Sequence, residues 1–271
     1  MHVNSESVAA FMVDESRRSV QSVERALTIV HLLADSGSGG TVSQLARQLG
    51  VHKSTASRLL ATLENAGMVE RDEATGIYRL GLDVVALSGT VLGRLEILHV
   101  ADPVLRRLAE TTQETVNFTI RYRDKVMNVQ QIPGPNVLRS FDWVGKTALL
   151  HRGAGSKALL AYLPADELRA YLDSPLVAHL DGSRRHLEQE LEEIRRTGFA
   201  VNRGEINPDV FAIGAPIFDG LGRCRASVSV AGSRTAFSDE RIPELARQVM
   251  STARTISQQL GHDVGGYAPL A

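Results

Sequence analysis

The chain has 271 residues, of which 43% are hydrophobic and 23% charged. This composition fits a globular protein of one large or two ordinary domains and excludes a disordered or fibrous chain. Thirty Lys and Arg residues against 31 Asp and Glu give a formal charge of −1. A chain so balanced has no bulk attraction to nucleic acid or to an anionic membrane, so any DNA binding has to come from a local patch.

The single cysteine, Cys224, excludes an internal disulfide framework and a cysteine-only metal cluster, and it predicts a reducing compartment. Its neighbours Arg223 and Arg225 would suit an activated thiol, but the strand-like flanks favour a structural cysteine. No apolar stretch approaches the ~20 residues of a membrane-spanning helix, and residues 1–6 lack the layout of a signal peptide. We therefore expect a soluble, cytoplasmic protein without a membrane partner.

The N-terminal part predicts an arm followed by three helices. Residues 1–18 show no sustained period and are expected to form a flexible arm. From Ser19 onward, apolar residues follow the i, i+3, i+4, i+7 spacing of an amphipathic helix until a glycine-rich stretch stops it. Ser43 is expected to cap a short second helix that Gly50 closes. A third helix begins near His52.

The third helix and the segment after it predict a winged helix-turn-helix over residues 19–81. Leucine and alanine at helical spacing give the third helix a core face, while its other face is polar and nearly without acid. Two strand-like runs, residues 68–71 and 77–80, flank a turn-rich connector typical of a hairpin. Three helices followed by such a hairpin form a known DNA-docking unit.

The third helix carries the strongest functional signal. A helix in the major groove needs short polar side chains near its N-terminus and Arg or Lys for phosphates and guanine edges. Residues 17–65 carry six basic and three acidic side chains, a local charge of +3. The alternatives are a solvated helix face and, for the wing, an ordinary surface hairpin. The predicted DNA contacts are Arg17, Arg18, Gln44, Lys53, Ser54, Thr55, Ser57, Arg58, Thr62, Arg71 and Arg79.

The second half predicts a separate domain. The pattern after the wing is helical with an interruption at Pro103, and residues 82–99 would form a linker helix. Residues 100–262 alternate strand and helix patterns, and residues 263–271 form a tail. Period-two alternation over residues 115–122 predicts a half-buried strand. Further strands are expected at 125–132, 137–141, 199–203, 210–218 and 224–231, and helices at 156–163, 165–172, 183–196 and 239–260. This order favours an antiparallel sheet flanked by helices, an α+β fold.

No catalytic, cofactor or metal motif is complete. Residues 153–158 look like a phosphate-binding loop, yet the glycine before Lys157 and the Ser or Thr after it are missing, which favours a helix start. The eight histidines form no His-x-x-x-His pair, and His151, in an apolar run, is interpreted as structural. There is no Gly-x-Ser-x-Gly motif. The sequence thus indicates neither an enzyme nor a bound cofactor or metal.

Two sets of motifs resemble the isocitrate-lyase-regulator (IclR) family of bacterial transcription factors, and the resemblance spans roughly residues 18–260. The first set is RSVQSVERAL at 18–27, Leu45-Ala46 with Gly50, Lys53-Ser54-Thr55, RLLATL at 58–63 and Tyr78-Arg79-Leu80-Gly81. The second set is Ala101-Asp102-Pro103, Glu114-Thr115-Val116, Val144-Gly145, KALLA at 157–161, Arg195 to Gly198 and APIFD at 215–219.

The resemblance implies a DNA-binding winged helix, a linker helix and a GAF-like domain that binds a small metabolite, usually an organic or aromatic acid. Members typically form dimers or dimers of dimers on palindromic operators near catabolic genes. Carried over by position, the family's effector pocket corresponds to Val137, Ser140, Ala148, Ala154, Gly155, Asn202, Val210, Ala212, Ser229 and Ala231.

Departures from the family pattern bear on the effector. Asn202 stands where sensors of small acids often have an acid, and Ala212 replaces a common cysteine. Fewer polar groups converge than a two- or three-carbon acid would need. Phe141, Trp143 and Phe211 lie close in sequence and favour a larger, partly apolar or aromatic effector, the alternative being that they fill the core.

We therefore predict a metabolite-responsive transcriptional regulator, a repressor of a catabolic operon that binds double-stranded operator DNA as a homodimer or homotetramer. Effector binding would shift the population between two arrangements of the paired winged helices. The alternatives are a small-acid-processing enzyme with an appended winged helix, and a winged helix used only for protein contacts. Convergent catalytic residues would support the enzyme. A salt-dependent DNA-binding assay distinguishes a winged helix used only for protein contacts from a DNA-binding regulator.

Overall fold

The computed structural model describes residues 20–93, 95–135, 143–178 and 184–262. The chain divides into two compact units, Met1–Arg94 and Leu95–Ala271. The predicted arm and tail, and the predicted strand at 137–141, lie outside the described residues. In the described part of the chain, no single helix is long and apolar enough to cross a membrane.

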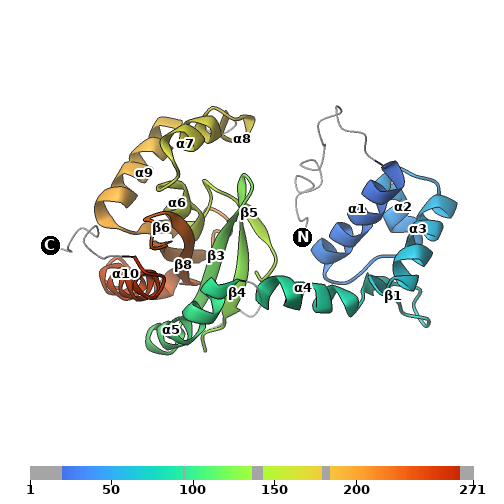
Figure 1. The fold of residues 1–271 in the computed structure, drawn as a ribbon, viewed down its shortest axis with the longest axis horizontal. Helices are drawn as coiled ribbons and strands as arrows, with labels where there is room; N and C mark the ends of the chain where they lie inside the picture. Colours follow the sequence, from blue (N-terminus) through green and yellow to red (C-terminus); the bar gives the residue numbers. More distant parts are fainter. Residues whose placement is uncertain (1–19, 94, 136–142, 179–183, 263–271) are drawn as a thin grey trace. The chain divides into compact units, whose positions relative to one another are not determined.

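The first unit contains three helices and a hairpin, as predicted (Figure 1). In chain order its elements are α1 (Gln21–Ser36), α2 (Val42–Leu49), α3 (Lys53–Asn65), β1 (Val69–Arg71), β2 (Tyr78–Leu80) and α4 (Asp83–Gly93). The apolar stripes of the helices meet in one core with the hairpin, which is why α3 keeps a fixed face toward solvent. The buried residues of this core are Ile29, Leu32, Leu33, Leu45, Leu60, Leu63, Val69 and Tyr78.

Two local features of this unit differ from the sequence prediction. The N-cap of α2 is Thr41 and not Ser43: its hydroxyl accepts from the Gln44 backbone N–H, and the Gln44 side chain accepts from the Thr41 backbone N–H. This reciprocal capping box satisfies two otherwise unpaired donors, so it is preferred over a single serine cap. The glycine-rich stretch also adds a short pairing to the hairpin, because Gly40 and Tyr78 exchange two backbone hydrogen bonds of 2.9 Å.

The predicted helix interruption at Pro103 is wrong. Helix α5 (Glu96–Thr112) runs through Pro103, and the break separates it from α4, which ends at Gly93. The predicted boundary between linker helix and effector domain, at residues 99 and 100, also falls inside α5. Pro103 is the eighth residue of the helix, so it removes the backbone hydrogen bond to the His99 carbonyl. The proline lies on the exposed side of α5, where water can pair that carbonyl, while the buried face of the helix packs against α10.

The second unit is built on one six-stranded antiparallel sheet, which confirms the α+β prediction. Its strands are β3 (Thr115–Tyr122), β4 (Lys125–Ile132), β5 (Thr147–Leu149), β6 (Ala200–Arg203), β7 (Val210–Phe218) and β8 (Cys224–Ser233). The spatial order is β5-β4-β3-β8-β7-β6. Strands β7 and β8 are joined by the turn at Asp219, whose side chain accepts from the Leu221 and Arg223 backbone N–H groups.

Helices cover both faces of this sheet (Figure 1). The helices are α6 (Ala154–Leu160), α7 (Ala165–Leu172), α8 (Pro175–Ala178), α9 (Arg184–Thr197) and α10 (Ile242–Gln259), in addition to α5. Helix α6 packs on β7 and β8 with α9 behind it, and α5 and α10 lie on the opposite face. The short elements β5 and α8 were not predicted.

The prediction of a half-buried β3 is wrong for residues 116–119, where both faces of the strand are covered. The apolar face, with Val116 and Phe118, packs on the α5 and α10 side. The other face, expected in solvent, carries Asn117 and Thr119, which are only 8% and 7% exposed. Polar side chains on a covered sheet face indicate a site that needs polar groups.

Candidate DNA-binding surface and ligand cavity

Helix α3 presents a polar face that starts at its first residue. Its N-cap is His52, whose Nδ1 lies 2.9 Å from the Ser54 hydroxyl and accepts from the Ser54 N–H. Gly50 takes the left-handed conformation between α2 and α3, with φ of 64°, which glycine adopts without strain. This tight connection holds the two helices in the geometry of a helix-turn-helix.

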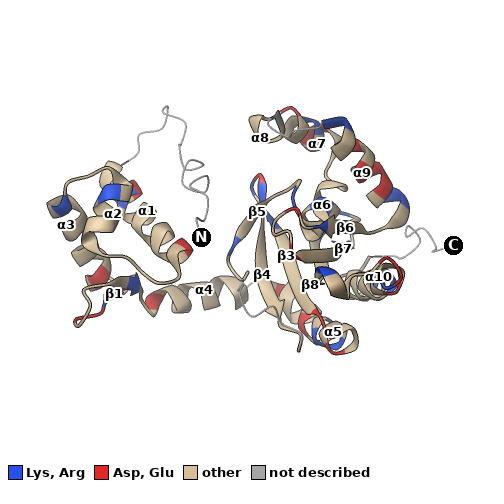
Figure 2. Ribbon diagram, turned by 180° about the vertical axis from the view of Figure 1, so that it is seen from behind, with Lys and Arg blue, Asp and Glu red and all other residues tan. Residues whose placement is uncertain are grey.

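The predicted contact residues on α3 lie on its solvent face. Lys53, Ser54, Ser57 and Arg58 are exposed, and Thr55 is half-buried. Basic positions are visible on α2, on α3 and at β1 in Figure 2. Among the described residues, no carboxylate lies within ion-pair distance of Lys53 or Arg58, so both cations are available to an anionic partner.

Three of the predicted contacts have hydrogen-bond partners within the chain. The Gln44 side-chain oxygen accepts from the Thr41 N–H and hydroxyl at 2.8 and 2.9 Å. The Thr62 hydroxyl donates to the Arg58 carbonyl at 3.0 Å, and Ser54 contacts the cap. The Gln44 side chain therefore acts first as a helix cap, a role that its position three residues after Thr41 could have revealed.

The wing offers weaker phosphate ligands than α3. Arg79 forms an ion pair with Asp72 at 3.6 Å, and the guanidinium of Arg71 lies 5.9 Å from the centroid of the Tyr78 ring. Hydrogen bonds from Thr75 hold the pKa of Asp72 below its ordinary value, and the positive charge of Arg79 lowers this pKa by a smaller amount. Both arginines are exposed, but Arg79 already has a partner. The predicted Arg17 and Arg18 lie outside the described residues.

The second unit contains a cavity of about 690 Å³, including its open mouth, between the sheet and the start of α6. Eight of the ten residues predicted for the effector pocket line it, and the other two, Val137 and Ser140, lie outside the described residues. The eight lining residues come from β5, α6, β6, β7 and β8, which are far apart in sequence. The eight lining residues are Ala148, Ala154, Gly155, Asn202, Val210, Ala212, Ser229 and Ala231.

Eleven further residues line the cavity. The sequence prediction missed ten of them and named the eleventh, Trp143, only for its aromatic character. These eleven residues are Asn117, Thr119, Val126, Asn128, Trp143, Lys146, Thr147, Gly153, Ser156, Ile206 and Asn207. The polar face of β3 was available as a signal, but it was assigned to solvent. The lining side chains of β5 could not be found by period alone, because this strand has only three residues.

The cavity wall is mainly apolar and carries one positive charge. Lys146 is the sole charged side chain among the described lining residues, and it is exposed. Trp143, one of the three aromatic residues singled out in the sequence, lines the cavity. Phe211, also singled out in the sequence, does not line the cavity and instead lies under Arg203, with 5.9 Å from guanidinium to ring centroid. Phe141 lies outside the described residues.

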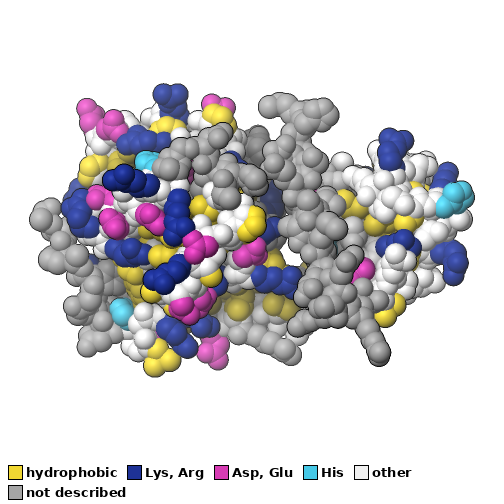
Figure 3. All heavy atoms as spheres, turned by 90° about the horizontal axis from the view of Figure 1, so that it is seen from above, with side chains coloured by type: hydrophobic (Ala, Val, Ile, Leu, Met, Phe, Trp, Pro, Cys, Tyr) yellow, Lys and Arg dark blue, Asp and Glu magenta, His cyan; other side chains and the backbone are white. Residues whose placement is uncertain are grey.

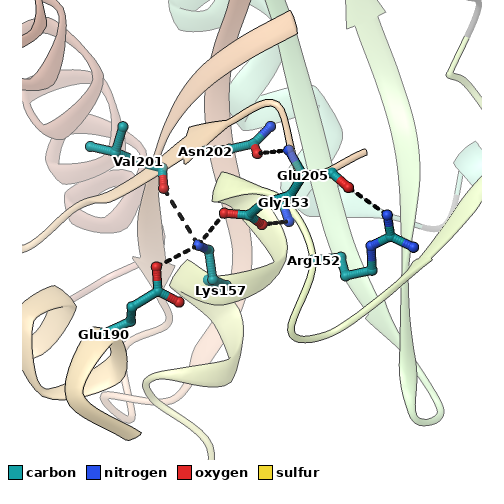
Figure 4. Close-up of polar contacts among 7 residues, drawn as sticks. All are labelled: Arg152, Gly153, Lys157, Glu190, Val201, Asn202 and Glu205. Atoms are coloured by element: carbon teal, nitrogen blue, oxygen red, sulfur yellow. Dashed lines mark hydrogen bonds and ion pairs between the residues drawn. The ribbon is translucent and has the colours of Figure 1, made fainter. Parts of the chain in front are cut away.

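Ion pairs of one buried lysine fix the start of α6 beside the cavity (Figure 4). Lys157 is 1% exposed, and its Nζ donates to Glu190 Oε1 at 3.1 Å and to Glu205 Oε1 at 2.5 Å. Glu205 Oε2 accepts from the Gly153 N–H at 2.8 Å, and its own backbone N–H donates to Asn202 Oδ1 at 2.9 Å. The lysine of the apparent phosphate loop is thus already paired with two carboxylates, and Asn202 is held by a backbone contact.

His151 and Cys224 have structural roles. His151 is buried, its Nδ1 lies 2.8 Å from the Tyr171 hydroxyl, and burial lowers its pKa. Burial also raises the pKa of Cys224 to about 12, so the thiol is not activated. Among the described residues, no group of three or more His, Cys, Asp or Glu side chains could hold a metal ion.

Comparison with known proteins agrees with both units. The IclR helix-turn-helix domain matches residues 22–73, and the bacterial transcriptional regulator IclR C-terminal domain matches residues 89–258. The chain belongs to the IclR family of bacterial transcriptional regulators. The predicted resemblance is therefore confirmed.

Relatives and solved structures extend over nearly the whole chain. The DNA-binding transcriptional repressor YiaJ of Escherichia coli is 30% identical over 262 residues, which cover 93% of both chains. The crystal structure of the Thermotoga maritima IclR protein matches with a TM-score of 0.71 and 27% identity, over 89% of this chain and 99% of that one. An IclR homologue from Microbacterium hydrocarbonoxydans, solved with 4-hydroxybenzoate, has the same fold, with a TM-score of 0.74, 20% identity and coverage of 88% and 98%.

These findings fix the general class of the protein. This IclR-family protein is a DNA-binding transcriptional regulator, and repressors occur among its relatives. The enzyme alternative is set aside because the relatives are named as regulators.

Proposed function

We propose that this IclR-family regulator is a repressor that binds a palindromic operator as a homodimer, or as a dimer of such dimers, and responds to a small organic or aromatic acid. One observation carries the proposal. Helix α3 of the first unit has exposed basic side chains without ion-pair partners among the described residues, and the second unit holds a cavity lined by one positively charged side chain. Arg58 represents the first and Lys146 the second. The regulated operon, a catabolic one in our prediction, is part of the proposal.

Helix α3 is the proposed recognition helix. Its first eleven residues contain no acid, and the earliest carboxylate is Glu64. The positive end of the helix dipole and Lys53 both favour phosphate there. Ser54 and Ser57 are short enough to let the backbone approach the groove, and Arg58 can reach a guanine edge.

Arg58→Ala is expected to weaken operator binding. If Arg58 reads a guanine edge, the loss is about 1–3 kcal/mol and discrimination at one base position disappears. If it holds a phosphate, affinity falls equally for all DNA sequences. The slope of log affinity against log salt concentration then becomes smaller in magnitude by about one. Fluorescence anisotropy at several salt concentrations separates the two. Arg25→Ala, on α1, is the charge-matched control. Unchanged binding by a folded Arg58→Ala protein would remove α3 from the interface.

Exposed apolar side chains support the homodimer. No residue of α4 is buried. Four apolar side chains on and just before this helix are 58–79% exposed: Leu82, Val85, Leu87 and Val91. Figure 3 shows hydrophobic side chains among the basic ones on the same unit. A solvated helix of eleven residues is marginal in water without a packing partner. A second copy is the partner that also supplies the second recognition helix which a palindrome requires.

Replacing both Leu87 and Val91, which lie four residues apart on one face of α4, by Glu is expected to give a monomer. The two new charges would be buried without partners if α4 packed against a second copy, and that is costly. Light scattering should show half the mass, and affinity for a two-half-site duplex should fall by about 10²-fold or more, because the second half-site no longer adds to binding. Ala170→Glu, on the exposed face of α7, controls for added charge. A double variant that stays dimeric contradicts the assignment of α4.

The cavity supports an acid as effector. Lys146 gives the wall a positive charge, while Trp143, Val126 and Ile206 offer apolar contact area. Ligand sites in proteins are usually apolar with a few convergent polar groups. A related protein was solved with 4-hydroxybenzoate, which is an aromatic acid of this kind. A response requires that the acid bind more tightly to one arrangement of the DNA-binding units than to the other.

A further inference from the structure

One wall of the cavity places a buried amide beside a lysine. The backbone N–H of Asn128 on β4 donates to the Lys146 carbonyl at 3.0 Å. Two residues earlier on β4, Val126 pairs with Ala148 of β5. Both Val126 and Ala148 line the cavity. Because side chains alternate along a strand, Asn128 and Lys146 share the cavity face with that pair.

Lys146 is the charged end of this wall. It is exposed, and in the described part of the chain no carboxylate lies within ion-pair distance of its ammonium group. The other cavity-side lysine, Lys157, differs because Glu190 and Glu205 already neutralise it. A carboxylate in the cavity would therefore find its counter-ion at Lys146, near the solvent side.

Asn128 is the buried end. It is 7% exposed, and its Nδ2 donates to Asn117 Oδ1 at 3.1 Å. Its Oδ1 is buried and has no hydrogen-bond partner among the described residues. Buried polar atoms are nearly always paired, so an unpaired acceptor on a cavity wall selects a ligand that brings a donor.

We propose that the cavity selects acids that also carry a hydroxyl or another hydrogen-bond donor, and that it binds them donor-first. Asn128 Oδ1 accepts from the donor at the buried end, and Lys146 pairs with the carboxylate toward the mouth. Trp143 covers the apolar body between them. This inference rests on the proposed effector function and adds its specificity and the orientation of the ligand.

Matched probes test the two contacts separately by calorimetry on the full-length protein. One set is 4-hydroxybenzoate, benzoate and 4-hydroxybenzamide, and a smaller set is 3-hydroxybutyrate, butyrate and 3-hydroxybutyramide. The hydroxy acid of at least one set is expected to bind about tenfold or more tightly than both of its analogues, since each analogue leaves one group without its partner. If no hydroxy acid binds, or if the analogues bind equally well, the inference is wrong.

Variants assign the preferences to residues. Lys146→Gln is expected to lower affinity for the hydroxy acid about tenfold or more and to leave the hydroxy amide unchanged. Asn128→Leu should abolish the difference between the hydroxy acid and the plain acid. Lys125→Gln, on the opposite face of β4, is the matched control. Lys146 is exposed, so its variant tests the proposal even if Asn128→Leu fails to fold.

Operator binding separates this inference from the proposed function. If hydroxy acids change operator affinity and the Lys146→Gln protein responds with wild-type preferences, the specificity inference fails and the regulator stands. If the folded protein binds no duplex with sequence preference, the proposed function itself fails.

Discussion

Ala212→Phe is expected to abolish the response to the acid while operator affinity stays at the wild-type value. Ala212 lies on β7, is 8% exposed and lines the cavity beside Asn202 of β6 and Ala231 of β8. A phenyl group there fills the space that the ligand needs, whereas the DNA-binding unit has a core of its own. The measurement is operator affinity with and without the acid that acts on the wild-type protein. A bulky residue at Ser229 should have the same effect.

Two further variants control for the size and the position of the group added in Ala212→Phe. Ala212→Val adds less volume and should reduce the response without abolishing it. Ala170→Phe adds the same group on the exposed face of α7 and should leave the response intact. An unimpaired response in a folded Ala212→Phe protein would mean that the acid binds elsewhere.

Arg241→Ala is expected to destabilise the second unit by about 3–5 kcal/mol, because it leaves a buried carboxylate without its partner. Glu114 is 2% exposed, and its Oε1 accepts from Arg241 at 2.8 Å. Arg241 also donates to the Thr112 and Ala236 carbonyls, each at 2.8 Å. Urea unfolding measures the loss. Arg196→Ala, which removes an exposed pair with Glu193, should cost less than about 1 kcal/mol.

The pH dependence of that loss follows from Glu114. Burial raises the pKa of Glu114 above its ordinary value of 4.5, and the hydrogen bond from Arg241 opposes this rise. Since the folded pKa is the higher one, ionisation of Glu114 disfavours the fold as pH rises above about 4.5. Without Arg241 the folded pKa rises further. The stability gap between wild type and Arg241→Ala should therefore narrow as pH falls toward 4.5, and a gap independent of pH would contradict the pairing.

Local patterns predicted most elements of the fold, because hydrophobic period and capping residues act within one element. The three N-terminal helices, the hairpin and strands β3 and β4 follow from such patterns. The errors lie where tertiary contacts decide. The proline in α5 was interpreted as a break, but the helix continues through it because its buried face packs against α10.

The cavity was harder to predict than the recognition helix. The face of α3 is a property of one helix, so its period reveals it. The cavity joins strands that lie up to about a hundred residues apart, and eight of its residues were found through the family resemblance. Asn117 and Asn128 were missed because a polar residue opposite an apolar strand face is normally in solvent. Here α6 and the cavity cover that face.

Selection of bound duplexes from a random-sequence pool, followed by footprinting, tests the central claim most directly. We predict enrichment of an inverted repeat whose half-sites lie one helical turn, or a multiple of it, apart, since paired winged helices read successive major grooves on one side of the duplex. Both half-sites should be protected together, and an acid from the matched sets should change that protection. Equal recovery of all sequences, or protection of a single half-site by a monomer at saturating protein, would contradict the account.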